Sequence, residues 1–261
     1  MSELVELSVT EKIAIVTLNR PDVRNAINDA MRNELVAVLE SVAADEGMLA
    51  MIITGRGSAF CAGGDISGMK ERLDAPTGHV AFNGWKRQRQ VHKSIALLHN
   101  MPKPVIAAVN GTATGLGCDM ALACDFIFAA EQAKFAMSFI KRGLVSDGGG
   151  MYFLPRRVGL SRAKELIFTG RIVDAQQALT IGLADRIAPG DRLISEAVVW
   201  ARELSQGSRA SLALSKEILD RTFESTAEQI FALGREAQAI CYTTTEHRDS
   251  VSAFLNRPPR R

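Results

Sequence analysis

Apolar and polar positions alternate along most of the chain in patterns that predict strands and helices in turn. Short apolar runs indicate strands, and apolar side chains recurring every three or four residues indicate helices. The predicted strands lie at residues 13–18, 49–54, 105–109, 126–129 and 134–137. The predicted helices lie at residues 28–42, 85–98, 117–123, 161–170 and 174–182. Ser161 is expected to cap one helix, and Asp174 with Gln177 forms a capping-box pattern for the next. Residues 67–83 are polar, contain Pro76 and are predicted to form a loop.

The C-terminal part of the sequence has a different pattern. From residue 191 onward it predicts helices only, at residues 191–205, 209–223, 226–241 and 247–255. Strands and helices in alternation, followed by helices alone, predict an α/β core with a helical C-terminal portion. We therefore expect two parts, residues 1–190 and residues 191–261.

The composition is that of an ordinary globular protein, with 261 residues of which 47% are hydrophobic and 23% charged. A net charge of +2 without a basic block argues against nucleic acid as a partner. Residues 1–6 lack a signal-peptide pattern, and no apolar run approaches the roughly 20 residues that span a bilayer. The 4 cysteines show no C-x-x-C pair and are interpreted as reduced, buried thiols. We expect a cytoplasmic protein that binds no membrane.

Two glycine-bearing segments that follow predicted strands carry the clearest chemical signal. They are residues 60–65, Phe-Cys-Ala-Gly-Gly-Asp, and residues 110–119, Asn-Gly-Thr-Ala-Thr-Gly-Leu-Gly-Cys-Asp. Glycine lets backbone N–H groups approach a ligand because no Cβ stands in the way. Two N–H groups from separate loops can converge on one oxygen that becomes negative during a reaction, which makes an oxyanion hole. The sequence therefore predicts acyl chemistry.

The same segments resemble those of the crotonase (enoyl-CoA hydratase/isomerase) superfamily. Residues 18–26, residues 143–150 with Leu-Pro-Arg at 154–156, and more weakly residues 252–255 also match, so the resemblance spans almost the whole chain in order. It implies a spiral of ββα units whose C-terminal helices pack between subunits of a homotrimer or a dimer of trimers. It also implies an acyl-CoA substrate, with coenzyme A arriving as part of the substrate and no cofactor permanently bound.

The resemblance assigns the two oxyanion donors to the N–H groups of Gly64 and Leu116. Leucine replaces the glycine that hydratases often carry there, but the backbone donor survives that change. Asp119 lies three residues after Leu116, about one helical turn, and so faces the same side. Hydratases usually carry glutamate at this position and dienoyl-CoA isomerases carry aspartate, which makes Asp119 a candidate base. Alternatively, Asp119 only stabilises the first turn of the helix through its dipole.

Phe139 and Asp147 separate isomerisation from hydration. Phe139 matches the position of the second glutamate of hydratases, and a phenyl ring cannot exchange a proton. Adding water across a double bond needs two proton-transfer groups, so this change counts against hydration. Asp147, which three glycines follow, matches a catalytic aspartate of members resembling the epoxyphenylacetyl-CoA isomerase. It also matches the nucleophile of 4-chlorobenzoyl-CoA dehalogenases, but those enzymes have tryptophan at the position of Phe139. Asp147 is the stronger base candidate, and the alternative is a simple Asp-Gly turn.

For the coenzyme A and substrate contacts, the resemblance indicates residues from both motifs and from the C-terminus. They are Arg24, Ala26, Ala62, Asp65, Phe139, Phe254 and Arg257. Asn25 is expected to hold a turn instead of contacting coenzyme A. Phe254 has core packing as its alternative, and Arg257 replaces a lysine of the family.

Other chemistries find no support in the sequence. The 4 histidines show no metal-ligand spacing, so no metal site is expected, and His92 and His99 lack a nearby carboxylate partner in sequence. No G-x-S-x-G motif indicates a serine hydrolase. Gly115 and Gly117 follow a strand as in dinucleotide-binding loops, but Met120 stands where the third glycine is needed.

Together these features predict an acyl-CoA enzyme that stabilises a thioester enolate and shifts a double bond, an enoyl-CoA isomerase. Enoyl-CoA hydratase is the alternative within the same class, followed by an acyl-CoA thioester hydrolase or a ring-epoxide isomerase. The alternative from another class is a non-catalytic scaffold that binds coenzyme A or RNA.

Overall fold

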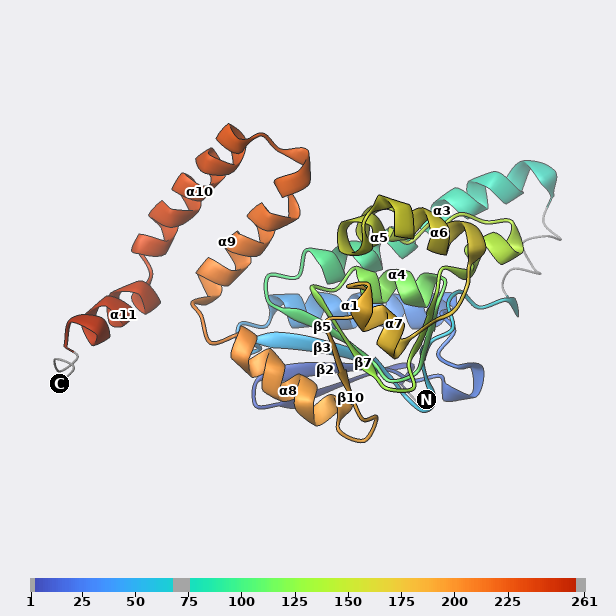
Figure 1. The fold of residues 1–261 in the computed structure, drawn as a ribbon, viewed down its shortest axis with the longest axis horizontal. Coiled ribbons are helices and arrows are strands. Elements are labelled where there is room, and N and C mark those ends of the chain that lie inside the picture. The colour runs from blue at the N-terminus through green and yellow to red at the C-terminus, as the bar shows by residue number, and fades with distance from the viewer. Residues whose placement is uncertain (1–2, 68–75, 257–261) are drawn as a thin grey trace.

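Two β-sheets form the body of the protein in a computed structural model that describes residues 3–67 and 76–256 (Figure 1). The six-stranded sheet has the order β1 (Val5–Thr10), β2 (Ile13–Leu18), β3 (Ala50–Gly55), β5 (Val105–Val109), β7 (Phe126–Ala130) and β10 (Arg186–Ala188). The four-stranded sheet has the order β4 (Ala59–Cys61), β6 (Thr112–Thr114), β8 (Lys134–Ala136) and β9 (Val173–Asp174). Only the pairs β1–β2 and β8–β9 are antiparallel among these strands.

The order of the elements repeats along the chain. A strand of the larger sheet, a strand of the smaller sheet and a helix follow one another twice, first as β3, β4 and α3 (Thr77–His99), then as β5, β6 and α4 (Leu116–Leu122). This is the spiral of ββα units that the resemblance implies, and the predicted α/β class is confirmed. Because parallel strands end at the same edge, the segments after β4 and after β6 lie side by side.

The remaining helices surround the two sheets and extend beyond them. They are α1 (Asp29–Ala44), α5 (Gly150–Val158), α6 (Leu160–Thr169), α7 (Ala175–Thr180), α8 (Leu193–Leu204), α9 (Arg209–Asp220), α10 (Ala227–Tyr242) and α11 (Thr245–Leu255). Short 3-10 helices are η1 (Pro21–Val23), η2 (Ser138–Arg142) and η3 (Thr222–Glu224). None of the helices in the described ranges is long and apolar enough to cross a lipid bilayer.

Several local predictions need correction. Residues 77–83 belong to α3 and are not a loop, and α5 and β1 were not predicted. Ser161 lies inside the first turn of α6, where Gly159 holds the N-cap position without a side-chain cap. The predicted cap of α7 is confirmed, because the side chain of Asp174 accepts from the N–H of Gln177.

Two hydrophobic clusters lie on the opposite faces of the larger sheet. Along β3, Met51 and Ile53 join the cluster beneath α1, α3 and α4, whereas Ile52 packs toward α8. Trp200 of α8 is buried there, and its ring centroid is 4.9 Å from that of Phe126. The alternation follows from the strand period of two residues, which sends neighbouring side chains to opposite faces.

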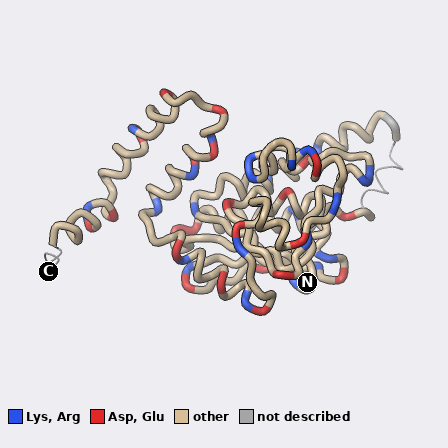
Figure 2. The backbone as a smooth tube through the Cα atoms, in the orientation of Figure 1, with Lys and Arg blue, Asp and Glu red and all other residues tan. Residues whose placement is uncertain are grey.

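The last three helices project away from the body (Figure 1). None of the residues of α9, α10 and α11 is buried, within the ranges that the structure describes. Lys216 of α9 is paired with Asp125 of the body at 2.8 Å, which anchors the start of this arm. Residues after 190 thus divide between α8 on the sheet and the projecting helices, and the expected boundary at residue 190 stays a prediction. Figure 2 shows basic and acidic residues interspersed along the chain.

Candidate active site

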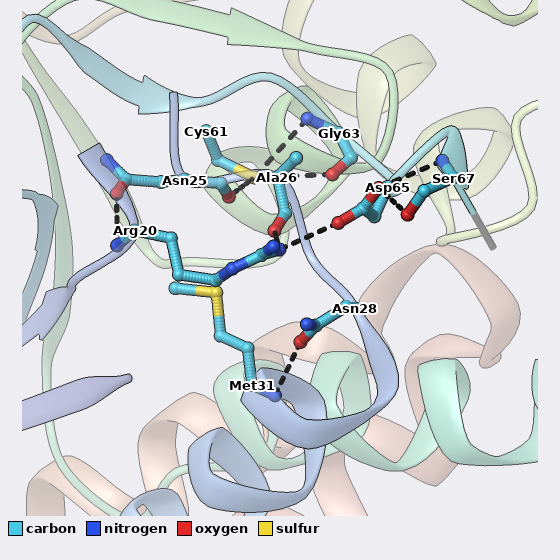
Figure 3. A network of polar contacts seen from close by, with 9 residues as sticks. All are labelled: Arg20, Asn25, Ala26, Asn28, Met31, Cys61, Gly63, Asp65 and Ser67. Carbon is cyan, nitrogen blue, oxygen red and sulfur yellow. Dashed lines mark hydrogen bonds and ion pairs between the residues drawn. The ribbon is translucent and has the colours of Figure 1, made fainter. Parts of the chain in front are cut away.

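Asn25 organises the loop of the first motif, as the sequence predicted. It is fully buried and has a left-handed φ of 57°. Its Oδ1 accepts from the N–H of Arg20 at 2.9 Å, and its Nδ2 donates to the carbonyl oxygens of Ala59 at 2.8 Å and Phe60 at 3.2 Å. One side chain therefore closes its own turn through Arg20, as Figure 3 shows, and also joins that turn to β4.

An ion pair joins the first motif to the first glycine segment. Nη1 of Arg20 lies 2.9 Å from Oδ2 of Asp65 and also donates to the carbonyl oxygen of Ala26 (Figure 3). Oδ1 of Asp65 accepts from the Ser67 hydroxyl at 2.7 Å. The hydrogen bonds from Ser67, and then from Arg20, lower the pKa of Asp65. The carboxylate is thus engaged within the chain, and its predicted contact with coenzyme A stays a prediction.

Backbone hydrogen bonds fix the glycines of the first segment. Ile27 donates to the carbonyl oxygen of Gly63 at 2.8 Å, and the N–H of Asp65 donates back to Ile27 at 3.0 Å. The N–H of Ala62 donates to the carbonyl oxygen of Arg24 at 2.9 Å. Ala62 and Arg24, both predicted to contact coenzyme A, therefore lie side by side. Gly64 lies in the middle of these hydrogen bonds between residues 24–27 and residues 62–65. The N–H of Gly64 itself has no partner among the described residues.

The second glycine segment presents Leu116 as the first residue of α4. Gly115 before it has a φ of 53°, a conformation that favours glycine, and its N–H donates to Ala136 at 2.9 Å. The N–H of Leu116 has no partner within the described parts of the chain. A Cβ placed on Gly63 would lie 3.5 Å from the nitrogen of Leu116, so the two glycine segments touch. Thr114 closes the contact by donating to Ala62 at 3.0 Å.

Phe139 lies beside the second donor. A Cβ on Gly115 would be 3.8 Å from the ring Cζ of Phe139, so the phenyl ring packs against the backbone immediately before Leu116. The ring is half-buried and joins the main hydrophobic cluster. This side of the predicted oxyanion hole is therefore apolar.

Asp119 is fully buried. Its Oδ1 accepts from the hydroxyl of Ser146 at 2.9 Å, and its Oδ2 accepts from the N–H of Gly148 at 2.9 Å. Burial raises the pKa of Asp119 to about 7. The hydrogen bonds from Ser146 and Gly148 lower this pKa, and the neighbouring charge of Asp147 raises it further. Gly150 packs so closely that a Cβ there would lie 2.2 Å from Oδ1 of Asp119. Asp119 thus holds the residues on either side of Asp147.

Asp147 is half-buried and stands between the two residues that Asp119 holds. Its Oδ2 accepts from Nε2 of Gln88, and its carbonyl oxygen accepts from Nε2 of His92 at 2.9 Å. A Cβ on Gly148 would lie 2.7 Å from Cδ1 of Leu116, so this loop packs against the second donor. The structure therefore brings Asp147, Leu116 and Gly64 into one neighbourhood.

Some predicted residues lie elsewhere. Phe254 is 68% exposed on α11, so the alternative of core packing is wrong. Figure 1 shows α11 at the end of the projecting arm. Arg257 lies outside the described residues. Arg24 does lie beside the first glycine segment through its bond from Ala62, as an exposed residue at the end of η1. His99, expected to lack a carboxylate partner, has its Nε2 3.9 Å from Oδ2 of Asp220.

A hollow of about 790 Å³ lies between the end of α1, residues 102–104 and the helices α9 and α11. None of the predicted site residues that the structure describes lines it. It belongs to the junction with the projecting arm and not to the neighbourhood of Gly64 and Leu116.

Three residues near Asp147 were not predicted from the sequence, namely Gln88, His92 and Ser146. Gln88 and His92 are four residues apart on α3 and therefore share a face. That spacing was visible, but nothing local indicated that this face meets a loop 59 residues further along.

Comparisons with known proteins show the family and the fold of the chain. The family model described as enoyl-CoA hydratase/isomerase matches residues 8–260. The chain is 35% identical over 246 residues to a probable enoyl-CoA hydratase of Rhizobium meliloti, covering 94% of this chain and 91% of that protein. It is also 35% identical over 255 residues to the 1,2-epoxyphenylacetyl-CoA isomerase of Escherichia coli, covering 98% and 96%. The crystal structure of an enoyl-CoA hydratase from Mycobacterium smegmatis superposes with a TM-score of 0.89 at 31% identity, covering 99% of both chains.

Proposed function

The chain belongs to the enoyl-CoA hydratase/isomerase family, and from this premise we propose that it moves the double bond of an enoyl-CoA, with Asp147 as the base. The observation that carries this proposal is that the half-buried Asp147 precedes Gly148, which packs against the side chain of Leu116, while the phenyl ring of Phe139 packs against Gly115. One acid–base group and an apolar wall suit a proton shift, which consumes no water.

The reaction begins at the α-carbon of a 3-enoyl thioester. Asp147 removes the proton from C2, and the electron pair of the broken C–H bond forms a dienolate whose charge rests on the thioester oxygen. The N–H groups of Gly64 and Leu116 stabilise that charge, and one such donor typically contributes about 3 kcal/mol. Asp147 then returns the proton to C4, which yields the 2-enoyl thioester. No atom is gained or lost, and nothing is oxidised.

Asp119 supports the base in this proposal and does not touch the substrate. It has no exposed surface, and its two hydrogen bonds go to Ser146 and Gly148. A carboxyl group that holds both neighbours of Asp147 fixes the direction in which the base points.

Hydration is the second candidate function. Hydration is favoured by the names of similar proteins, among them a short-chain-enoyl-CoA hydratase of Clostridium acetobutylicum. It is also favoured by the raised pKa of Asp119, about 7, because a carboxyl group with that pKa can donate a proton near neutral pH. In that case Asp119 and Asp147 would share the two proton transfers of water addition. Hydrolysis of the thioester and a non-catalytic role in binding coenzyme A or RNA rank below both.

Coenzyme A would be held by the two motif loops. Arg24, Ala26 and Ala62 lie on the two segments whose backbone hydrogen bonds flank Gly64, so the pantetheine arm would run along these segments toward the thioester carbonyl. The projecting helices α9–α11 expose apolar side chains such as Phe231, and we assign them to contacts within a homotrimer or a dimer of trimers.

The test is to incubate the protein separately with a 3-enoyl-CoA and a 2-enoyl-CoA and to identify the products by mass spectrometry and NMR. The proposal expects the 3-enoyl-CoA to become the 2-enoyl-CoA. Rapid formation of 3-hydroxyacyl-CoA from the 2-enoyl-CoA, without double-bond migration, would replace isomerisation by hydration.

A further inference from the structure

The helix α3 contacts Asp147 at two different atoms. Nε2 of Gln88 donates to the side-chain Oδ2, and Nε2 of His92 donates to the backbone carbonyl oxygen at 2.9 Å. A carbonyl oxygen can only accept, so Nε2 of His92 must carry a hydrogen. Because the two residues are one helical turn apart, a single face of α3 supplies both bonds.

We propose that Gln88 and His92 are positioning residues that aim Asp147 at the substrate. The proposal rests on the proposed function, in which Asp147 is the base. On one side the loop is held by Asp119 through Ser146 and Gly148, and on the other side by α3 through Gln88 and His92. Asp147 is thus fixed from two directions, and its backbone and its side chain are held separately.

Gln88 divides the two oxygens of the carboxylate between different tasks. Oδ2 is occupied by the amide, whereas Oδ1 has no hydrogen-bond partner among the residues that the structure describes. Oδ1 is therefore the oxygen that accepts the proton from C2 and delivers it to C4. A carboxylate rotating freely would present either oxygen in many directions, so the bond to Gln88 selects the productive orientation.

An amide suits this position better than a cation. Arginine or lysine would stabilise the negative carboxylate strongly and weaken it as a base. Glutamine is neutral and can donate through Nε2 to the carboxylate or accept through Oε1 from the protonated acid. Oε1 of Gln88 is buried and has no partner within the described parts of the chain. Rotation of the amide would bring this oxygen to the carboxyl group, so Gln88 can serve Asp147 in both protonation states.

The first experiment replaces Gln88 and uses a matched control on the same helix. Gln88→Met keeps the length of the side chain but removes the amide, and Gln88→Asn keeps the amide but shortens its reach. Gln90→Met makes the same exchange at an exposed position of α3. The assays are kcat and KM with a 3-enoyl-CoA, and exchange of the α-protons of butyryl-CoA in D2O followed by NMR. Thermal unfolding shows that each variant is folded.

We expect Gln88→Met to lower kcat and the exchange rate together by roughly 10- to 100-fold, because misaimed catalytic groups lose rate on this scale. KM should stay within about twofold, and Gln88→Asn should lose less. The rates of the Gln90→Met variant should match the wild type. Equal rates for Gln88→Met and Gln90→Met, or a loss confined to KM, would overturn the positioning role.

The second experiment addresses the backbone contact. His92→Leu removes the donor to the carbonyl oxygen of Asp147, and His92→Gln replaces it with an amide donor. We expect kcat to fall several-fold in His92→Leu and to recover in His92→Gln. If both variants lose the same activity, His92 does not act through its hydrogen bond.

These outcomes separate the present inference from the proposed function. A wild-type protein that neither isomerises a 3-enoyl-CoA nor exchanges α-protons contradicts the proposed function itself. A wild-type protein that does both, together with an inactive Asp147→Asn variant and a fully active Gln88→Met variant, contradicts only the positioning role.

Discussion

Replacing Asp119 by asparagine would separate the charge of this residue from its hydrogen bonds. Asparagine can accept from the N–H of Gly148 through Oδ1 and donate to the hydroxyl oxygen of Ser146 through Nδ2, because a hydroxyl both donates and accepts. The shape of the side chain is unchanged, which matters where Gly150 packs so tightly. The loop that carries Asp147 should therefore keep its conformation.

The magnitude follows from the pKa of Asp119, which burial raises from 3.8 to about 7. Between these values the unfolded chain has lost the proton and the folded protein has kept it. The unfolded state then binds fewer protons, so the free energy of unfolding falls as pH rises toward and through the folded pKa. For this shift, the contribution of Asp119 should fall by roughly 3 kcal/mol between about pH 5 and pH 8. The side chain of the Asp119→Asn variant cannot ionise, so that variant should lack this dependence.

The assay compares urea unfolding of the wild type and Asp119→Asn at both pH values, together with their isomerisation rates. The difference between the two proteins isolates Asp119 from other titrating groups. We expect the variant to gain stability relative to the wild type as pH rises and to keep kcat within about tenfold, since Asp119 is a support and not the base. Parallel stability curves would refute the raised pKa. Complete loss of isomerisation in a folded Asp119→Asn protein would refute the supporting role.

Three further predictions concern the glycine loops, the projecting arm and the apolar wall. Gly117→Ala should destabilise the protein by about 2 kcal/mol and reduce turnover, because the added Cβ would lie 2.2 Å from the carbonyl oxygen of Cys61 in the other glycine segment. The control in thermal unfolding is Gly84→Ala, because the space around Gly84 is open. Lys216→Met should cost about 2 kcal/mol in urea unfolding, because it removes the cation that lies 2.8 Å from the half-buried carboxylate of Asp125. An unchanged midpoint would show that this pair does not hold α9. Phe139→Glu should raise hydration of a 2-enoyl-CoA about tenfold by supplying a second proton-transfer group beside Gly115, and an unaltered product would show that the ring does not decide the reaction.

The sequence predicted elements whose signals are local. The strands at β3, β5 and β7 are runs of buried apolar residues, and the turn held by Asn25 was recognisable from its motif. By contrast, β1 was missed although Val5, Leu7 and Val9 alternate with polar residues, which is the pattern of a strand; in the fold only Val5 of these residues is buried. The start of α3 was predicted as a loop because Pro76 and Gly78 stand in a polar stretch, and α5 was missed because it begins in a run of glycines.

The site was predictable only in part, for a related reason. Gly64, Leu116 and Asp147 lie in motifs that can be read along the chain. The hydrogen bond from Ser146 to Asp119 spans 27 residues and that from Gln88 to Asp147 spans 59, so neither leaves a local pattern. Burial of Asp119 likewise depends on the packing of Gly148 and its neighbours, which only the folded chain defines.

Removal of the carboxylate of Asp147 tests the central claim most directly. Asp147→Asn keeps an oxygen that can accept from Gln88 but cannot take a proton, so folding and substrate affinity should be preserved. We predict that conversion of a 3-enoyl-CoA to the 2-enoyl-CoA, followed by absorbance of the conjugated product, falls by on the order of 10³-fold, with KM little changed. A folded Asp147→Asn protein that converts the substrate at the wild-type rate would contradict the account.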